Sequence, residues 1–296
     1  MRIWIVVGKS SIRKHHINLL GKNLPELGTS VGSWMMAPPP KSRKRKCVEN
    51  IRDEAESTSS IVVKSPYFST SKADPNPAEN VGSKRLPASF YDQPCEALAK
   101  ALLGQRLIHT VNGDERIAGD IVETEAYLGK EDSACHAYEG LRTSRNEAMY
   151  MKPGTCYVYL IYGMYDCLNI SSRGDGQAVL IRALEPKEGI PAMQGHRSRR
   201  RKEPRKELKM KDLCSGPGKL TEALRIKTAE VNHADLMADP SIWMERGDIK
   251  VKEADIVGCP RVGVDYATEE WVKKPLRFYI RGNGCVSKRD KEAEKS

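Results

Sequence analysis

The sequence has few aromatic residues and no long apolar run. Aromatic side chains make up 6% of the 296 residues, and phenylalanine occurs only three times. No stretch approaches the roughly 18 consecutive apolar residues of a membrane-spanning helix, which excludes such a span. The apolar run from Ile3 to Val7 is shorter than the core of a secretory signal peptide. We therefore expect no contact with membranes and a protein of the cytosol, the nucleus or an organelle interior.

The eight cysteines lack the spacing of a metal site. No two of them are separated by two residues, and the six histidines form no His-Glu-x-x-His pattern. Five of the last seven cysteines lie in or next to apolar runs, where a reduced cysteine is an ordinary small core residue. We therefore expect buried thiols in a reducing compartment and no metal ion.

Positive charge is concentrated in two segments. The formal net charge is +10: residues 1–85 hold 15 Lys and Arg against 7 Asp and Glu, and residues 86–296 hold 34 against 32. Within the second part, His196 to Asp212 carries nine basic and three acidic residues. Such segments suit loose, salt-dependent contact with a polyanion, and plain solvated surface is the alternative.

Residues 1–85 predict a disordered basic tail. They show no sustained hydrophobic period, so they bury too little apolar surface to offset the entropy of ordering. The basic run from Lys41 to Lys46 is typical of a nuclear import signal. Residues 1–25 hold five basic residues and no acidic one, which is a weak sign of organelle targeting. Translation from Met35 or Met36 would remove residues 1–34.

An ordered domain is expected over residues 86–290, with a flexible end at 291–296. A helix is predicted from Asp92, as its cap, to Gly104, and another begins at Ser215-Gly216-Pro217. Asn112-Gly113 between two β-prone runs is a strong hairpin signal. Short connections favour an antiparallel meander, so the fold class is α+β: one domain with a curved antiparallel sheet and packed helices. The predicted strands are 106–111, 116–127, 155–162, 166–171, 178–184, 261–264 and 276–281.

Two carboxylates lie near the end of one predicted strand. The period of two places Glu123 and Glu125 on the same face. Such a pair suits acid–base chemistry, although an exposed strand edge with two solvated charges is the commoner arrangement. Tyr127 and His136 follow within eleven residues of Glu125 and favour the functional interpretation.

Tyrosines gather between residues 157 and 165, which hold four of the eleven in the chain. Arg142, Arg145 and Lys152 precede them. A core would normally prefer Phe and Leu, because a buried Tyr hydroxyl needs a partner. Tyr rings beside cations suit stacking on bases and contact with phosphates, while half-buried strand filler is the alternative.

Two short segments add geometric hints of DNA contact. The tight turn Tyr162-Gly163-Met164-Tyr165 carries large side chains, as does a hairpin that enters the minor groove as a wedge. Gly218-Lys219 stands at a predicted helix start, where free N–H groups favour an anion, here a DNA phosphate. The glycine spacing of a Walker A loop is absent.

Six blocks of sequence, in fixed order, carry a resemblance to a known family. They are IVETEAYLG (121–129), MKPG (151–154), YVYLIYGMY (157–165), NISS (169–172), IRALEP (181–186) and LCSGP (213–217). Together they resemble the alkyladenine DNA glycosylases, also called 3-methyladenine or N-methylpurine glycosylases. The resemblance runs from about residue 86 to 287, and Glu139 and Ser144 depart from it, because the family often has Arg or Gly and then Pro in that loop.

The resemblance implies a monofunctional base-excision enzyme. Such an enzyme flips a damaged purine (3-methyladenine, 7-methylguanine, hypoxanthine or ethenoadenine) out of duplex DNA and hydrolyses its N-glycosidic bond. One carboxylate and a water suffice for this, so we expect no cofactor. The expected partner is double-stranded DNA containing damaged purines, and the expected state is a monomer.

The resemblance also implies a role for each matching residue. Glu125 matches the general base, and Arg182 matches a residue that contacts the water and the sugar-phosphate. Asn169 matches the residue that rejects the 2-amino group of guanine. Tyr162 matches the side chain that fills the vacated place in the stack. Tyr127, His136 and Tyr159 match the residues around the flipped base, and further DNA contacts are expected from Met164, Tyr165, Arg142, Arg145, Gly218 and Lys219.

Two other functions remain open at this point. One is a non-catalytic protein that binds the minor groove with the same wedge. The other is an RNA-directed enzyme on the same sheet, because a basic aromatic surface alone permits either nucleic acid. Release of free base from a duplex containing hypoxanthine or ethenoadenine separates these functions.

Overall fold

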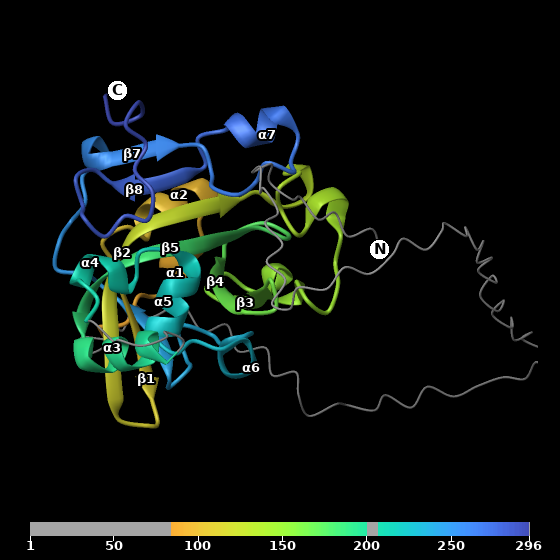
Figure 1. The fold of residues 1–296 in the computed structure, drawn as a ribbon. Coiled ribbons are helices and arrows are strands. Elements are labelled where there is room, and N and C mark those ends of the chain that lie inside the picture. Colours follow the sequence, from red (N-terminus) through yellow and green to blue (C-terminus); the bar gives the residue numbers. More distant parts are fainter. Residues whose placement is uncertain (1–83, 200–206, 296) are drawn as a thin grey trace, which may run out of the picture. The chain divides into compact units, whose positions relative to one another are not determined.

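The computed structural model describes residues 84–199 and 207–295. The basic run from Lys41 to Lys46, the two alternative start positions and all but the last two residues of the expected tail lie outside these ranges. The described residues form a single domain in which helices pack on a curved antiparallel sheet (Figure 1). The predicted α+β fold class is therefore confirmed.

All strand pairs of the sheet are antiparallel. The main path runs β3-β4-β5-β2-β1-β6, while β8 pairs with β2 and with β7 away from that path. The strands are β1 (Arg106–Val111), β2 (Glu115–Tyr127), β3 (Cys156–Ile161), β4 (Tyr165–Ser171), β5 (Ala178–Glu188), β6 (Ile242–Glu245), β7 (Ile256–Cys259) and β8 (Arg277–Ile280).

Strand β2 is the centre of the sheet, and the sheet forks along it. Its first half pairs with β1 up to Asp120, and its last part pairs with β8 over Glu123–Glu125. Its other edge follows β5, with register shifts around Glu123. Ten consecutive positions of β2, 117–126, are buried, so side chains that point to either face are covered. This segment of the chain therefore has no solvent-exposed edge.

Helices cover the sheet in separate groups. Helix α2 packs on β2, β5 and β8, whereas α3, α4 and α5 pack on one another and on β2, β4 and β5 (Figure 1). The main core runs between these layers, with Leu98, Leu107 and Leu220 among its fully buried side chains. The helices are α1 (Ala88–Tyr91), α2 (Cys95–Ala101), α3 (Ile190–Ser198), α4 (Met210–Leu213), α5 (Pro217–Ala223), α6 (Thr228–Val231), α7 (Glu269–Lys273) and the 3-10 turns η1 (Gly129–Glu131), η2 (Tyr138–Gly140), η3 (Glu147–Tyr150) and η4 (Glu253–Asp255).

The local turn signals are confirmed. Asn112 and Gly113 both have positive φ, 54° and 91°, and they lie in the tight turn 112–114 that joins β1 to β2, where Val111 pairs with Glu115. The helix predicted after Ser215 begins at Pro217. The seven cysteines within the described ranges are free and buried, as expected. Among the described residues, no helix is long and apolar enough to cross a membrane.

Two local predictions are wrong. Residues 261–264 form no strand; the strand lies earlier, in β7, and the segment that follows is an irregular loop. In that loop the Arg261 side chain donates to the carboxylate of Asp132. The Val262 N–H donates to the carboxylate of Glu125 instead of to a neighbouring strand. Asp92 does not cap α2, because its carboxylate binds Arg173, and Pro94 precedes the helix without a side-chain cap. Strand β6 and helix α3 were not predicted.

The last described residues, up to 295, form turns. The Glu294 carboxylate accepts hydrogen bonds from Arg289 at 2.8 and 2.6 Å, and it lies 3.1 Å from the Tyr279 hydroxyl. The flexible end at 291–296 and the boundary near residue 86 stay predictions.

Candidate active site

The two carboxylates of β2 are completely buried. Glu123 and Glu125 each have 0% exposure, because β2 lies between β5 and β8 at these positions. The alternative of two solvated charges on a strand edge is therefore wrong. The sequence could not reveal this burial, because β8 joins the sheet about 150 residues later in the chain.

Three donors hold the carboxylate of Glu125. Its Oε1 accepts the Val262 N–H at 2.7 Å and lies 3.2 Å from Nη1 of Arg182. Its Oε2 accepts the Tyr127 hydroxyl at 2.9 Å. Both oxygens of the carboxylate are therefore engaged, which fixes the orientation of the group.

Arg182 joins Glu125 to Glu123. Its Nε donates to Glu123 Oε1 at 3.1 Å, and Arg277 donates to the same oxygen at 2.9 Å. The Ser287 N–H donates to Glu123 Oε2 at 2.6 Å. Burial acts to lower the pKa of Arg182, but the two carboxylates outweigh it and the pKa is raised. Two carboxylates thus face two guanidinium groups, which is the balance that a buried charge cluster needs.

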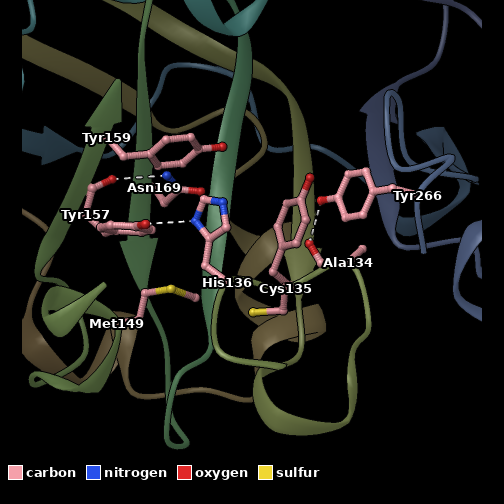
Figure 2. Close-up of a pocket in the computed structure, with 9 residues that line it drawn as sticks. Ala134, Cys135, His136, Met149, Tyr157, Tyr159, Asn169 and Tyr266 are labelled. Carbon is pink, nitrogen blue, oxygen red and sulfur yellow. Dashed lines mark hydrogen bonds between the residues drawn. The ribbon is translucent and has the colours of Figure 1, made fainter. Parts of the chain in front are cut away.

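An aromatic pocket lies beside this cluster (Figure 2). His136 Nδ1 and the Tyr157 hydroxyl share a hydrogen bond of 2.8 Å, and the His136 and Tyr159 rings meet edge to face at 4.7 Å. The amide of Asn169 donates to the Tyr157 carbonyl at 3.1 Å, which fixes the side chain in the pocket wall. The lining residues are Tyr127, Ala134, Cys135, His136, Met149, Tyr157, Tyr159, Asn169 and Tyr266.

Tyr127 connects the pocket to the carboxylate. Its ring lines the pocket while its hydroxyl donates to Glu125. The guanidinium of Arg261 lies 4.7 Å from the centre of the Tyr127 ring. Arg261 also forms a fully buried ion pair with Asp132, with an N–O distance of 2.6 Å. Asp132 also accepts the Leu128 and Ala134 N–H groups, both at 3.0 Å. The walls of the pocket are therefore tied to the strand that carries Glu125.

The walls of the pocket are polar but uncharged at neutral pH. Burial, with a smaller contribution from Arg145, lowers the pKa of His136 to about 4, so its ring is neutral. Burial, together with the nearby Glu125 carboxylate, raises the pKa of Tyr127, and burial also raises the pKa of Tyr159. A flat aromatic ligand, neutral or cationic, meets no fixed positive charge in these rings.

The tip of the β3–β4 hairpin is the most exposed part of the aromatic block. Tyr162 is 83% exposed and has a φ of 52°, a region that bulky residues rarely adopt. Gly163 follows with a φ of 65°. Met164 and Tyr165 are also exposed, so three large side chains stand on one turn. An exposed residue with such a strained backbone makes the tip a candidate for contact with a ligand.

The cationic side chains that were expected to contact DNA lie at three different places in the structure. Arg145 is exposed and lies 5.4 Å from the Tyr159 ring, at the pocket. Arg142 instead pairs with Glu147 at 2.5 Å and lies over Tyr150. Lys219 lines a groove with Tyr162 and Tyr165.

Gly218 has a packing role beside that groove. A Cβ at this position would lie 3.0 Å from the Cβ of Tyr165, so a larger residue would require Tyr165 to move back by a few tenths of an ångström. Helix α5 is only seven residues long. The expected phosphate contact of Gly218-Lys219 therefore depends on the charge of Lys219 and not on a long helix.

Several residues of the site were not predicted from the sequence. Asp132, Arg261 and Val262 have no pattern that marks them, because their partners lie more than 100 residues away. Tyr266 stands alone in a loop and reaches the pocket through the tertiary fold. In the described ranges, no group of three or more His, Cys, Asp or Glu side chains has the geometry of a metal site.

Comparisons with known proteins define first the class and then the family. Residues 89–284 match the model of the family described as Methylpurine-DNA glycosylase (MPG). The class is thus that of the DNA glycosylases, enzymes of DNA repair that act on DNA. The resemblance drawn from the six blocks is confirmed: the chain belongs to the methylpurine-DNA glycosylase family.

Named relatives agree with the family model. A human protein named DNA-3-methyladenine glycosylase is 51% identical over 211 residues, which cover 71% of this chain and 70% of that protein. A mouse protein of the same name is 47% identical over 233 residues, which cover 78% and 67%. A probable DNA-3-methyladenine glycosylase of Encephalitozoon cuniculi is 48% identical over 194 residues, which cover 66% and 88%.

Proposed function

We propose that this glycosylase flips alkylated or deaminated purines out of duplex DNA and hydrolyses the N-glycosidic bond with a water activated by Glu125. The substrates are 3-methyladenine, 7-methylguanine, hypoxanthine and ethenoadenine. The observation that carries the proposal is the hydrogen bond from the Tyr127 hydroxyl to Oε2 of the buried Glu125, because the Tyr127 ring also lines the aromatic pocket.

The reaction needs one base and no covalent intermediate. A water that donates to Glu125 Oε2 stands next to a nucleotide whose base occupies the pocket. As the C1′–N bond lengthens, its electrons leave with the purine and the sugar gains oxocarbenium character. The water oxygen then bonds to C1′, and Glu125 accepts its proton. Arg182 and the Val262 N–H hold Oε1, so the carboxylate keeps one orientation during the transfer.

The pocket suits the proposed bases. Electron-rich Tyr rings attract a purine made cationic by N3 or N7 alkylation, by about 0.5–2 kcal/mol. The neutral His136 adds no repulsion to such a base. The amide of Asn169 donates to the Tyr157 carbonyl, which holds the side chain in the pocket wall and supports its role in rejecting the 2-amino group of guanine. Both features favour damaged purines over normal guanine.

The hairpin tip suits a wedge. Extrusion of a base costs a few kcal/mol, and an inserted side chain offsets part of that cost. Tyr162 is the most exposed of the large apolar side chains at the tip, so it is the residue that we assign to the vacated stack. Met164, Tyr165, Arg145, Lys219 and, once released from Glu147, Arg142 contact the flanking strand and phosphates. Gly218 keeps Tyr165 close to α5.

The proposal extends to the state and place of the enzyme. We infer that the enzyme acts on double-stranded DNA as a monomer, because a single chain supplies both the pocket for the flipped base and the side chain that fills the vacated stack. The run from Lys41 to Lys46 directs the protein to the nucleus, with organelle targeting by residues 1–34 as the alternative.

The decisive experiment measures free base released from a duplex that carries hypoxanthine or ethenoadenine. We expect the base in solution and an abasic strand that breaks only after alkali treatment. An undamaged duplex is the control for specificity, and an RNA duplex with the same lesion tests the RNA-directed alternative. Tight binding without release would support the non-catalytic minor-groove protein and contradict the proposed function.

A further inference from the structure

One wall of the aromatic pocket differs from all the others. Tyr266 belongs to the loop between β7 and α7 and lies on the other side of His136 from Tyr157 and Asn169, which belong to β3 and β4 (Figure 2). Of the nine lining residues, Tyr266 alone is exposed, with 70% of its surface open. The other walls are buried or half-buried. Tyr266 is therefore the wall with the least packing behind it.

Hydrogen bonds hold this wall in its closed position. The Tyr266 hydroxyl donates to the Ala134 carbonyl at 2.9 Å. Two residues later, the Thr268 N–H donates to the Ser133 hydroxyl at 3.0 Å. These contacts close the loop against the segment that leads to His136. The ring of Tyr266 itself is held by one neutral hydrogen bond, which changes an equilibrium by only about 2- to 10-fold.

The same loop is fixed at its other end. Arg261 is locked to Asp132, and the Val262 N–H donates to Glu125. Outward movement of the Tyr266 side chain therefore does not require movement of the groups that hold the catalytic carboxylate. Among the lining residues, Tyr266 thus combines the highest exposure with a hydroxyl that is held by a single hydrogen bond.

We propose that Tyr266 is a specificity-determining residue that sets how large a purine the pocket accepts. This inference rests on the proposed function. A base with the outline of normal purine, such as hypoxanthine, fits with Tyr266 closed on Ala134. A purine with a fused third ring, such as ethenoadenine, has a larger outline in any orientation and displaces the ring at the expense of its hydrogen bond. An enzyme discriminates through such differences in transition-state binding.

The test compares two lesions in one sequence context. Single-turnover excision of ethenoadenine and of hypoxanthine is measured for the full chain and for Tyr266→Ala. Removal of the wall should raise the ethenoadenine-to-hypoxanthine ratio of rates by about 2- to 10-fold, the range of the hydrogen bond that no longer has to break. Tyr266→Phe keeps the ring but loses the same hydrogen bond, so it should also raise the ratio within this range.

Tyr138 provides the matched control. It is a tyrosine of 38% exposure in η2 that does not line the pocket, so Tyr138→Ala should leave the ratio unchanged. An unchanged or lower ratio in active Tyr266→Ala overturns the inference, and so does an equal rise in Tyr138→Ala. Wild-type protein that releases neither base contradicts the proposed function, a result that is distinct from an unchanged ratio.

Discussion

Two regions of this enzyme differ sharply in how far their side chains are exposed to solvent. The end of β2 carries Glu123 and Glu125 with no exposure at all, between two neighbouring strands. The tip of the β3–β4 hairpin carries Tyr162 with 83% exposure and a strained backbone. Acid–base chemistry requires a carboxylate in one fixed orientation, whereas a wedge must reach beyond the protein surface. The comparison shows that the sheet holds the buried carboxylates on β2 and the exposed aromatic side chain on a different pair of strands, β3 and β4.

The largest effect is expected at the buried end. Glu125→Gln keeps the shape: its carbonyl can accept from Arg182 and Val262, and the Tyr127 hydroxyl can turn to accept from its NH₂ group. The variant cannot accept a proton, so excision should fall by at least about 10²-fold while lesion binding persists. Single-turnover base release and a gel-shift titration measure the two properties.

Glu123→Gln is the matched comparison, because Glu123 is equally buried but touches no pocket residue. It should act mainly through stability. If Glu123→Gln abolished turnover while Glu125→Gln left it intact, the assignment of the base would be reversed.

A smaller effect is expected at the exposed tip. Tyr162→Ser removes the wedge without touching Glu125, so the flipped fraction should decrease and excision should fall by about 10-fold or more. The loss should be greatest for well-paired lesions and least opposite a mismatch, where less pairing must be broken. Fluorescence of ethenoadenine in the duplex reports the flipped fraction.

Tyr138→Ser serves as the control for loss of an exposed tyrosine. If Tyr162→Ser flips the base as fully as the wild type, then the wedge is another residue of the tip, with Met164 or Tyr165 the next candidates.

Deletion of residues 1–80 tests whether either region depends on the tail. Single-turnover excision should stay nearly unchanged, because the described site uses no residue before 84. Non-specific DNA affinity at low salt should weaken by about 10-fold and its salt dependence should flatten, since 13 Lys and Arg leave with the segment. Titrations at several salt concentrations check this, and loss of soluble folded protein would contradict the predicted disorder.

The smallest effect concerns pH. Burial lowers the folded-state pKa of His136 to about 4, below the unfolded value of 6.5. Between these values the unfolded chain binds a proton that the folded protein does not, so stability rises with pH across this window. His136→Gln should flatten that slope modestly in denaturant titrations between pH 4 and 6.5. His109, whose pKa burial also lowers, contributes in the same direction and remains in the variant. An unchanged slope would mean that His136 is charged in the folded state.

Local chemistry decided which parts of the fold could be predicted. The Asn112-Gly113 hairpin follows from turn geometry, and the β3–β4 pair follows from a short connection between two β-prone runs. The burial of Glu125 could not be predicted, because it depends on β8, which pairs across a long stretch of chain. The segment 261–264 has the composition of a strand, but two buried carboxylates compete for its donors. Tyr266 depends on the same loop, and no periodic pattern points to it.

The fork in β2 has a consequence for how activity is lost on heating. Around Glu123–Glu125 the backbone is bonded to β5 on one edge and to β8 on the other, so these amides cannot exchange with solvent by fraying. Their hydrogen exchange should require global unfolding, unlike that of the hairpin tip. The Glu125 carboxylate would then keep its place at every temperature at which the domain remains folded, and inactivation by heat would coincide with the unfolding of the whole sheet.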